Sequence, residues 1–365
     1  MRIGLIGQAG EPHCLQVQRA LASLGAEGVL IDASNFDAER RFGQDEACLL
    51  YNGEDAESFG AFYLRSILSP VPTVYVEDDQ YKLYEDWHQS YMLAREKHGF
   101  LLAWLLGLMA AGRPVINPPH LGTLSLLKPY QLLRLKQQGF PTPRTLVTND
   151  PAAAREFVAR VGAAIAKPVI GGAFAQEVTP ATLERLDMIR TAPVTFQERI
   201  AGPDIRVTAV AGQILSSVEI ESDVLDFRAA EGYERGDGNL TPAPLPDPVA
   251  RMVLAAMEAS HLGFSAVDLK RRGPDDYVIL ELNFSPAFLW IEARTGHPIS
   301  EGLARYLLAC AEFAERERAG SAETASRPAP REAPVGDAPP RRQDLNTFFE
   351  FGVPKPSSVA GYFGA

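Results

Sequence analysis

The stretch that decides the fold runs from 266 to 283 and reads AVDLKRRGPDDYVILELN. Two apolar runs flank a turn that contains Gly, Pro and two Asp, and this pattern predicts a β-hairpin. Side chains alternate between the two faces of a strand, so Glu281 and Asn283 point the same way and Leu282 points away. The hairpin also brings Asp268 opposite this pair, which gathers three oxygen-bearing side chains on one face.

Three hard oxygen donors among apolar neighbours are typical of a Mg²⁺ site. Mg²⁺ prefers a few carboxylates and takes its other ligands from water and phosphate. The residues around Asp268, Glu281 and Asn283 are apolar, so carboxylates held there without a cation would cost free energy. The alternative is a solvated hairpin edge with ordinary charges, and the hairpin alone does not decide between the two.

Two lysines upstream have settings that suit phosphate. Lys167 ends an apolar strand and leads into a turn with Gly171 and Gly172, where backbone N–H groups can fold over a phosphate. A plain hairpin turn is the alternative for this glycine pair. Lys128 begins a helix, and its alternative is an ordinary surface lysine.

The segment 196–206, FQERIAGPDIR, ends an apolar strand with Gln197 and Glu198 before a short connection. An adenine-binding hinge is often built in this way, with backbone groups that read the adenine edge and a carboxylate that binds the ribose. Arg206 and Arg228 are then candidates to hold phosphate or acyl phosphate, because a planar guanidinium can bind such groups with two hydrogen bonds. For each arginine the alternative is a surface ion pair.

The first hundred residues alternate strand and helix patterns, which predicts a mostly parallel sheet with right-handed crossovers. Glycines at 4, 7 and 10 have GxxGxxG spacing rather than GxGxxG, so a dinucleotide site there is weakly supported, although Asp32 lies where a ribose ligand would fall. The run FLLAWLLGLMAA at 100–111 is too short to span a membrane and predicts a buried core helix.

Further elements follow from the hydrophobic period and the turn residues. Strands at 194–198, 205–210 and 214–220 are expected to be antiparallel neighbours, with Ala211-Gly212 as the turn between the last two. The other expected elements are strands at 3–6, 28–32, 62–65, 73–76, 144–147 and 164–167, and helices at 15–24, 125–139, 151–161, 248–261 and 299–316.

Composition narrows the class of protein. The 365 residues include 35 Lys and Arg against 46 Asp and Glu, a net charge of -11, which argues against a protein that coats nucleic acid. Cys14, Cys48 and Cys310 lie far apart, which argues against a disulfide framework or a thiolate metal site and fits a reducing cytoplasm. The six histidines lack HxH or HExxH spacing, which argues against a zinc enzyme. We therefore expect a cytoplasmic protein with no nucleic-acid partner and no membrane partner.

Taken in order over residues 128 to 296, these motifs resemble the ATP-grasp fold. The ordered set is Lys167-Pro168, the glycine turn, the segment 196–206, Asp226-Phe-Arg228, Val267-Asp268 and the segment LELNFSP at 280–286. The likeness is closest to the branch that includes the ribosomal-protein S6 glutamate ligase and the ATP-grasp maturases of ribosomal peptides (graspetide ligases). Asn117-Pro-Pro119, the segments 140–149 and 62–65, and the helix that contains Glu156-Phe157 look most like the maturases.

The resemblance implies an α/β protein with three folded parts. A pre-ATP-grasp domain with a parallel sheet at 1–119 precedes the two α+β lobes of the ATP-grasp fold, a small lid lobe at 120–200 and a large lobe at 201–312 with the metal site. Beyond them, a stretch rich in Pro, Ala and charge predicts a disordered linker at 313–342. The tail at 343–365 is rich in Phe and Tyr, and we expect either an unstructured C-terminus or a motif that docks on a partner in the same pathway.

The resemblance also assigns roles to individual residues. The implied set is Lys128 and Lys167 on the ATP phosphates, Gly171 and Gly172 in the lid over them, Gln197, Glu198, Arg199 and Ile200 along the adenine, Asp204 beside the ribose, Asp268, Glu281 and Asn283 on Mg²⁺ or Mn²⁺, and Arg228, Arg206 and Lys167 as catalytic residues. Two departures affect this set. Arg228-Ala229-Ala230 replaces the Arg-x-Asn of the glutamate ligases, which puts the acceptor side in doubt, and the lid lacks a later glycine before Gln176.

The implied activity is an ATP-dependent ligase. A substrate carboxylate attacks the γ-phosphate to give an acyl phosphate and ADP, and an amine or hydroxyl then forms an amide or ester. A peptide or protein substrate is favoured by the maturase-like segments. The alternatives are a small-molecule amino-acid ligase of the glutathione-synthetase type and a nucleotide-binding module without catalysis. We also expect a homo-oligomer.

Overall fold

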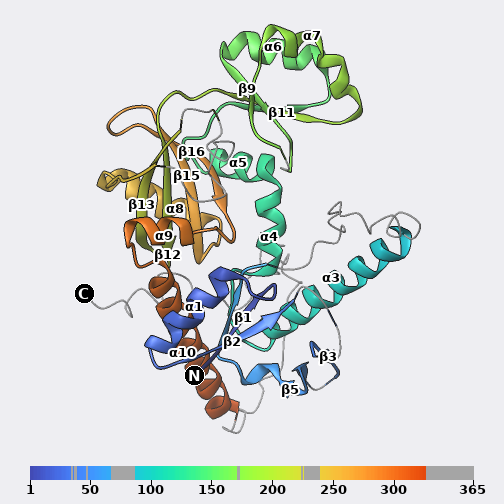
Figure 1. Cartoon of the computed structure of the whole chain (residues 1–365), viewed down its shortest axis with the longest axis vertical. Coiled ribbons are helices and arrows are strands. Elements are labelled where there is room, and N and C mark those ends of the chain that lie inside the picture. The colour runs from blue at the N-terminus through green and yellow to red at the C-terminus, as the bar shows by residue number, and fades with distance from the viewer. Residues whose placement is uncertain are drawn as a thin grey trace, which may run out of the picture. The chain divides into compact units, whose positions relative to one another are not determined.

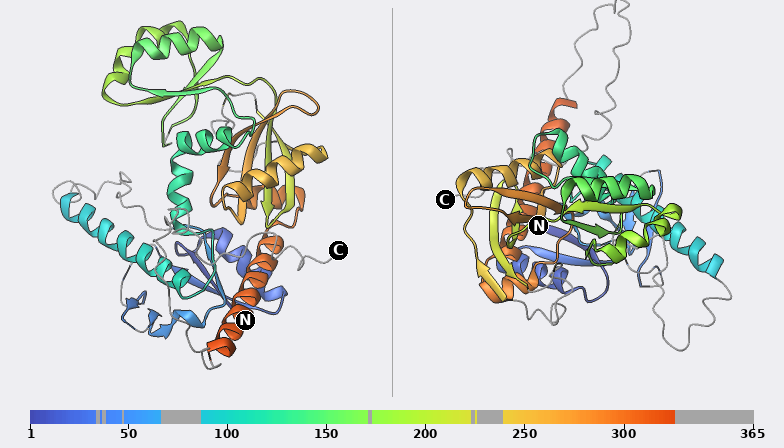
Figure 2. Two further views of the ribbon diagram at one scale, coloured as in Figure 1. Left: turned by 180° about the vertical axis from the view of Figure 1, so that it is seen from behind. Right: turned by 90° about the horizontal axis from the view of Figure 1, so that it is seen from above.

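The computed structural model describes residues 1–33, 36, 39–46, 48–66, 87–170, 173–222, 225 and 239–325. The chain divides into two compact units, the first formed by 1–119 with the chain from 303 onward and the second by 120–302. Each unit has its own sheets and its own core; Figure 1 labels many of their elements, and Figure 2 gives two further views in the same colours.

The first unit is built on a parallel sheet with strand order β2-β1-β6-β7. Its elements are β1 (Arg2–Gly7), α1 (Pro12–Ser23), β2 (Glu27–Asp32), β3 (Phe42–Gln44), β4 (Leu49–Tyr51), β5 (Glu54–Asp55), β6 (Ala61–Leu64), α3 (Trp87–Ala110), β7 (Val115–Ile116) and the C-terminal part of α10 (Ile299–Ala325). Strands β3, β4 and β5 form a separate small antiparallel sheet. The parallel sheet predicted for the first hundred residues is confirmed.

Helices α1 and α3 cover opposite faces of the parallel sheet (Figure 1). On one face, Gln18 of α1 lies so close to Gly28 that a Cβ there would sit 3.1 Å from Leu5 and 3.2 Å from the Gln18 backbone. On the other face, the ring of Phe62 meets the ring of Trp104 from α3 edge to face at 6.1 Å. Phe62 lies over Gly4, and Gly4 and Leu5 point to opposite faces because strand side chains alternate.

The second unit contains two antiparallel sheets. Its elements are α4 (Pro119–Leu126), α5 (Lys128–Gln137), β8 (Thr145–Thr148), α6 (Pro151–Val161), β9 (Ala164–Lys167), β10 (Gln176–Glu177), α7 (Pro180–Glu184), β11 (Val194–Glu198), β12 (Asp204–Val210), β13 (Gln213–Glu221), β14 (Asn239–Pro242), α8 (Asp247–Ala259), β15 (Phe264–Arg271), β16 (Tyr277–Asn283) and α9 (Leu289–Thr295). The strand orders are β10-β9-β11-β8 in the four-stranded antiparallel sheet and β14-β13-β12-β15-β16 in the five-stranded sheet.

Each of these sheets packs one face against a helix. Phe196 of β11 is buried with Phe157 of α6 in the core of the four-stranded antiparallel sheet. Val207 of β12, Leu269 of β15 and Val253 of α8 are buried together under the five-stranded sheet, and Figure 2 shows α8 lying across that sheet. The helix-covered faces are apolar, so the polar side chains of these strands gather on the opposite faces.

One predicted strand pairing is wrong. Strand β11 was expected beside β12 and β13, but it pairs with β8 and β9 instead. The connection to β12 is not a tight turn: it spans 199–203 and contains Gly202 at φ +120° followed by Pro203, so the chain leaves one sheet and begins another. The predicted β12–β13 hairpin is present, and both turn residues, Ala211 and Gly212, have positive φ.

Several boundaries also differ from the expected ones. The helix expected at 125–139 is two helices, α4 and α5, which meet at Leu127. Helix α10 continues to Ala325, so 313–325 is helical rather than the start of a disordered linker, and the helix passes from the second unit into the first. The strand expected at 73–76 and the chain from 326 onward lie outside the described residues.

Three findings bear on the class of protein. No helix among the described residues is long and apolar enough to cross a membrane. The apolar run at 100–111 forms most of the C-terminal half of α3, where Leu101, Trp104 and Leu108 are fully buried. Cys14, Cys48 and Cys310 are all free.

Candidate functional site

The hairpin β15–β16 brings the three predicted metal ligands together. Asp268 and Glu281 are direct cross-strand partners, and Asn283 Nδ2 donates to Asp268 Oδ2 at 3.0 Å. Leu282 points the other way into the core under α8 and is 1% exposed. The same alternation that buries Leu282 under α8 therefore holds two carboxylates and an amide on the opposite face of the hairpin, as the sequence predicted.

Asp268 is buried, and its charge environment is mixed. Burial raises the pKa of Asp268 to about 6; Arg206 opposes this shift, and the neighbouring Glu281 adds to it. Arg206 lies opposite Asp268 on β12, with Nη1 at 3.2 and 3.3 Å from the two carboxylate oxygens. A buried carboxylate beside a second carboxylate is stabilised by any nearby cation, so hard oxygen donors in this environment fit Mg²⁺.

The donor set combines two carboxylates with one amide. In the described part of the chain, no three His, Cys, Asp or Glu side chains come close enough to hold a metal ion together. A site with Asp268, Glu281 and Asn283 is consistent with this finding, because its third donor is an amide oxygen. Such a set would leave further positions of an octahedral ion to water and phosphate.

Lys128 reaches this group from helix α5. Its Nζ lies 2.5 Å from Glu281 Oε2. One turn along the helix, the Gln131 amide donates to Leu282 O and accepts from Leu282 N, both at 2.9 Å. Strand β16 is at the edge of the sheet, so Gln131 satisfies backbone groups that have no partner strand and fixes α5 beside it. Sequence reasoning missed Gln131, although its spacing of three from Lys128 places both on one helix face.

Lys167 and Gln197 meet on the face of the four-stranded antiparallel sheet that points away from α6. Lys167 Nζ donates to Gln197 Oε1 at 3.1 Å, and Gln197 Nε2 donates to Thr145 Oγ1 at 3.0 Å. Glu198 is the next residue and turns to the other face, where its carboxylate accepts the backbone N–H of Arg144 at 3.0 Å and pairs with the Arg144 guanidinium. The placement of Glu198 along the adenine therefore stays a prediction, and a nucleotide could use its carboxylate only if Arg144 released it.

The hinge continues through an exposed pair to the start of β12. Arg199 is exposed and pairs with Glu177 at 2.9 Å, and Ile200 follows it half-buried. Asp204 then begins β12 on the same face as Arg206, and Lys270 Nζ lies 2.8 Å from Asp204 Oδ2. Sequence reasoning missed Lys270, although the two-residue spacing from Asp268 already predicts a shared strand face.

Three predicted residues lie outside the described residues. Gly171 and Gly172 belong to the expected lid, and Arg228 was expected near the transferred phosphoryl group. Their roles remain predictions. The aromatic tail at 343–365 lies outside the described residues as well.

The first unit does not offer a phosphate site at the glycine-rich turn. The N-terminal amides of α1 are taken by the Glu11 carboxylate, which accepts from the N–H groups of His13 at 2.7 Å and Cys14 at 3.0 Å. Asp32, the weakly supported ribose ligand, pairs with Arg40 at 2.8 Å. A carboxylate from the chain itself occupies the anion position at this helix N-terminus, which argues against a dinucleotide there.

The described cysteine and serine side chains below give little support for catalysis by a nucleophilic Cys or Ser. Burial raises the pKa of Cys14 and of Cys310 to about 12, so both thiols stay protonated. Ser216 Oγ and His297 Nδ1 lie 2.7 Å apart, a pair that the sequence did not reveal because 81 residues separate them. Ser216 is only 3% exposed, so its hydroxyl is not open to a substrate.

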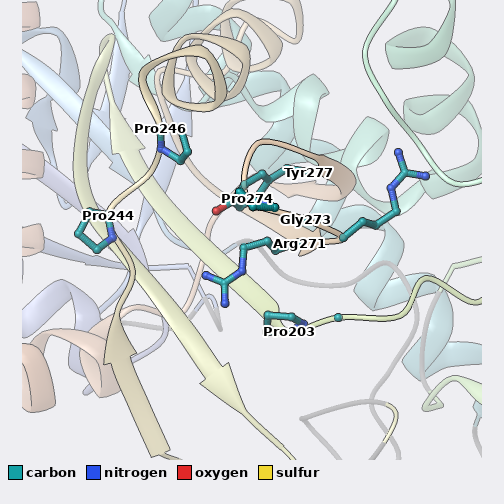
Figure 3. A pocket seen from close by; sticks show the side chains of 9 residues that line it. Pro203, Pro244, Pro246, Arg271, Gly273, Pro274 and Tyr277 are labelled. Carbon is teal, nitrogen blue, oxygen red and sulfur yellow. The ribbon is translucent and has the colours of Figure 1, made fainter.

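A separate pocket of about 620 Å³ lies at the other end of the β15–β16 hairpin (Figure 3). It is lined by Gly202, Pro203, Pro244, Pro246, Arg271, Arg272, Gly273, Pro274 and Tyr277. Both of its arginines have partners, because Arg271 pairs with Glu219 at 2.7 Å and Arg272 pairs with Asp276 at 2.8 Å. None of the predicted ATP or metal residues lines this pocket, so it is not the predicted site.

A parallel-sheet unit followed by two antiparallel sheets, with lysines and carboxylates on the faces that point away from their helices, defines an ATP-grasp architecture. The sequence of residues 126–307 matches the RimK-like ATP-grasp domain. The chain therefore belongs to the ATP-grasp ligases, in agreement with the resemblance of its motifs. No curated protein matches its sequence significantly.

Solved structures agree with this family. The ATP-grasp ligase PsnB in complex with a minimal precursor is 30% identical, with a TM-score of 0.73 over 84% of this chain and 98% of PsnB. PsnB with a phosphomimetic variant of its minimal precursor, Mg and ADP is 31% identical, with a TM-score of 0.75 over 84% and 97%. The RiPP-associated ATP-grasp ligase of Chryseobacterium gregarium, in complex with ADP and a leader and core peptide, shares the fold at 20% identity and a TM-score of 0.71, over 84% and 96%.

Proposed function

We propose that the chain is an ADP-forming ligase that joins a carboxylate to an amine or hydroxyl of a peptide or protein, with ATP and Mg²⁺ as cofactors. The observation that carries the proposal is the cross-strand arrangement of Asp268, Glu281 and Asn283, with Lys128 and Arg206 beside them. PsnB supports both parts of the proposal, since it was solved with Mg and ADP and with its precursor.

The proposed binding roles follow from charge. Lys128 and Lys167 bind the phosphates of ATP, and Asp268, Glu281 and Asn283 hold Mg²⁺, or Mn²⁺ in its place. The ion supplies charge neutralisation across the phosphate oxygens. Lys128 pairs with Glu281 and Arg206 pairs with Asp268, so cations and carboxylates lie side by side in the site. The lysine and arginine would face the phosphates and the carboxylates would face the cation, an arrangement in which each buried charge has a partner of opposite sign.

The proposed reaction has two steps. A substrate carboxylate oxygen attacks the γ-phosphorus, the bond to the β-phosphate oxygen breaks, and ADP leaves. The amine or hydroxyl then attacks the carbonyl of the acyl phosphate, phosphate leaves with the bonding electron pair, and the proton of the attacking group passes to solvent. Arg206, with Arg228 of the undescribed segment, neutralises charge on the transferred group. Positioning and charge compensation account for most of such catalysis.

The direct test is mass spectrometry of candidate precursor peptides incubated with the purified chain, ATP and Mg²⁺. Loss of one water per new bond, with equimolar ADP, is the expected result. Glu281→Gln is expected to reduce turnover by at least about a hundredfold, because the neutral amide loses the charge that holds the cation. Glu258→Gln on the exposed face of α8 is the matched control and keeps full activity.

Other outcomes would change the proposal. Mass gain by one amino acid would replace peptide cross-linking by amino-acid addition. Modification of free amino acids alone would favour a small-molecule ligase. Full activity in Glu281→Gln would remove the metal assignment, and ADP that binds without any turnover on carboxylate substrates would favour a binding module.

A further inference from the structure

Lys270 lies in the candidate site without an assigned role. It is on β15, two residues after Asp268, and it faces the same side of the sheet as Asp204, its cross-strand partner. Its Nζ donates to Asp204 Oδ2 at 2.8 Å and to the backbone oxygen of Gly202 at 3.1 Å. The side chains of both members of this pair are largely buried, with 17% of Lys270 and 15% of Asp204 exposed.

Lys270 lies on β15 between the predicted adenine hinge and the predicted metal site. Gly202 belongs to the connection that follows the predicted adenine hinge, whereas Asp268 belongs to the predicted metal site. Lys270 contacts Gly202 directly. It lies two residues beyond Asp268, which is about 6.6 Å along the strand at a rise of about 3.3 Å per residue. In a nucleotide that runs from the hinge to the metal, this is the level of the sugar.

We propose that Lys270 is a positioning residue that holds the Asp204 carboxylate toward a sugar hydroxyl of the nucleotide. The inference rests on the proposed ATP-dependent function and extends it to selectivity for ribose. The ammonium donates to the Asp204 carboxylate and to Gly202 O, and so fixes this carboxylate relative to the hinge backbone. A carboxylate held in one orientation accepts a hydrogen bond from a hydroxyl more strongly than a mobile one does.

Selectivity follows from the cost of an unpaired group. A site built to bind a hydroxyl discriminates against the analogue that lacks it, because the buried polar partner is then left unsatisfied. A hydrogen bond to a charged group contributes roughly ten- to a hundredfold in affinity. An ion pair that only stabilises the hinge would lower stability when broken, yet it would leave the ratio between ribose and deoxyribose nucleotides unchanged.

The test is isothermal titration calorimetry, which measures the affinity of the full chain for ADP, 2′-deoxy-ADP and 3′-deoxy-ADP in the presence of Mg²⁺. The wild type is expected to bind ADP at least about tenfold more tightly than one of the two deoxy analogues. Lys270→Met is expected to reduce this ratio to about threefold or less. Lys270→Arg, which keeps the charge, retains most of the preference, and the exposed Lys136→Met on α5 retains all of it.

Each outcome decides something. If Lys270→Met keeps the full ratio while its melting temperature falls, the pair is structural and the inference is wrong. If the wild type binds all three nucleotides equally, the inference is wrong while the proposed function stands. If the wild type binds no ADP, the proposed function itself fails. Should Lys270→Met not fold, Asp204→Asn provides the same measurement, because it removes the charged acceptor and leaves the lysine; an unchanged ratio there also overturns the inference.

Discussion

Glu11 shows how one side chain organises the start of the first unit. Its carboxylate accepts from the N–H groups of His13 and Cys14, lies 2.8 Å from His13 Nδ1, and accepts from Arg65 Nε at 3.1 Å. Burial alone would raise the pKa of Glu11, but the hydrogen bonds and the charges of His13 and Arg65 outweigh it and bring the pKa to about 2. The carboxylate therefore fixes the N-terminus of α1, the His13 ring and the end of β6 in one arrangement.

The shift of Glu11 predicts a defined pH dependence. Its folded-state pKa of about 2 lies below the ordinary value of 4.5, so its stabilisation is complete above pH 4.5 and is lost as the pH falls toward 2. Glu11→Gln is expected to cost about 1 kcal/mol at neutral pH, because the amide caps the helix without charge. Thermal unfolding of both proteins as a function of pH tests this.

The difference in melting temperature between Glu11→Gln and the wild type should shrink as the pH is lowered from 4.5 toward 2. Glu96→Gln, at an exposed position of α3, controls for the loss of one negative charge at neutral pH. A difference that stays constant over this pH range would show that Glu11 does not titrate as described.

At the scale of elements, the connection between β11 and β12 determines how two sheets join in the second unit. Gly202 in this connection has a φ of +120°, and a Cβ on it would lie 2.0 Å from the backbone oxygen of Arg271. The connection thus passes directly against the backbone of the β15–β16 hairpin. This contact, together with the Lys270 bond to Gly202 O, ties the predicted hinge to the five-stranded sheet.

Gly202→Ala is expected to destabilise the second unit by about 2 to 4 kcal/mol, because the methyl group collides with fixed backbone and the residue also has an unfavourable φ. Gly162→Ala is the matched control: Gly162 also has a positive φ, +81°, but open space around its Cβ position. Its cost should be limited to about 1 to 2 kcal/mol of backbone strain. Denaturant unfolding compares the two, and equal losses would mean that the hinge yields to relieve the contact.

At the scale of the whole molecule, the last helix belongs to the first unit from Leu303 onward. Leu303, Tyr306 and Leu307 are fully buried, and Ala311 lies so close to Gly60 that a Cβ there would be 2.7 Å away. The chain thus begins and ends its described part in the same unit. A chain cut at the end of the second unit would leave an apolar face of the first unit uncovered.

Truncation tests this arrangement. A chain of residues 1–302 is expected to aggregate or to lose the cooperative unfolding of the first unit, since each large buried side chain of α10 contributes about 1.5 to 3 kcal/mol. A chain of residues 1–325 keeps the whole described helix and is expected to unfold like the full-length protein. Size-exclusion chromatography and calorimetry distinguish these results; a stable, monodisperse 1–302 chain would contradict the assignment of α10.

The amino-acid sequence by itself determined the alternation of strands and helices, the β15–β16 hairpin, and the shared face of Asp268, Glu281 and Asn283. These features depend on local period and turn residues, which one segment contains in full. The ordered motifs also indicate the ATP-grasp family, which the family match over residues 126–307 confirms. The predicted orientation of side chains on β16 is confirmed at Leu282, which is buried, because alternation then places Glu281 and Asn283 on the other face.

Only the tertiary structure decided which strands pair at a distance and which side chains meet. Four such contacts join residues far apart in the chain. They are the pairing of β11 with β8, the hydrogen bonds of Gln131 to β16, the Glu198–Arg144 pair and the Lys270–Asp204 pair. Such contacts depend on how whole elements bury their apolar faces, and a local sequence pattern does not contain that information. The tertiary structure also argues against a phosphate site at the glycine-rich turn of the first unit, because the Glu11 carboxylate occupies the helix N-terminus that a phosphate would need.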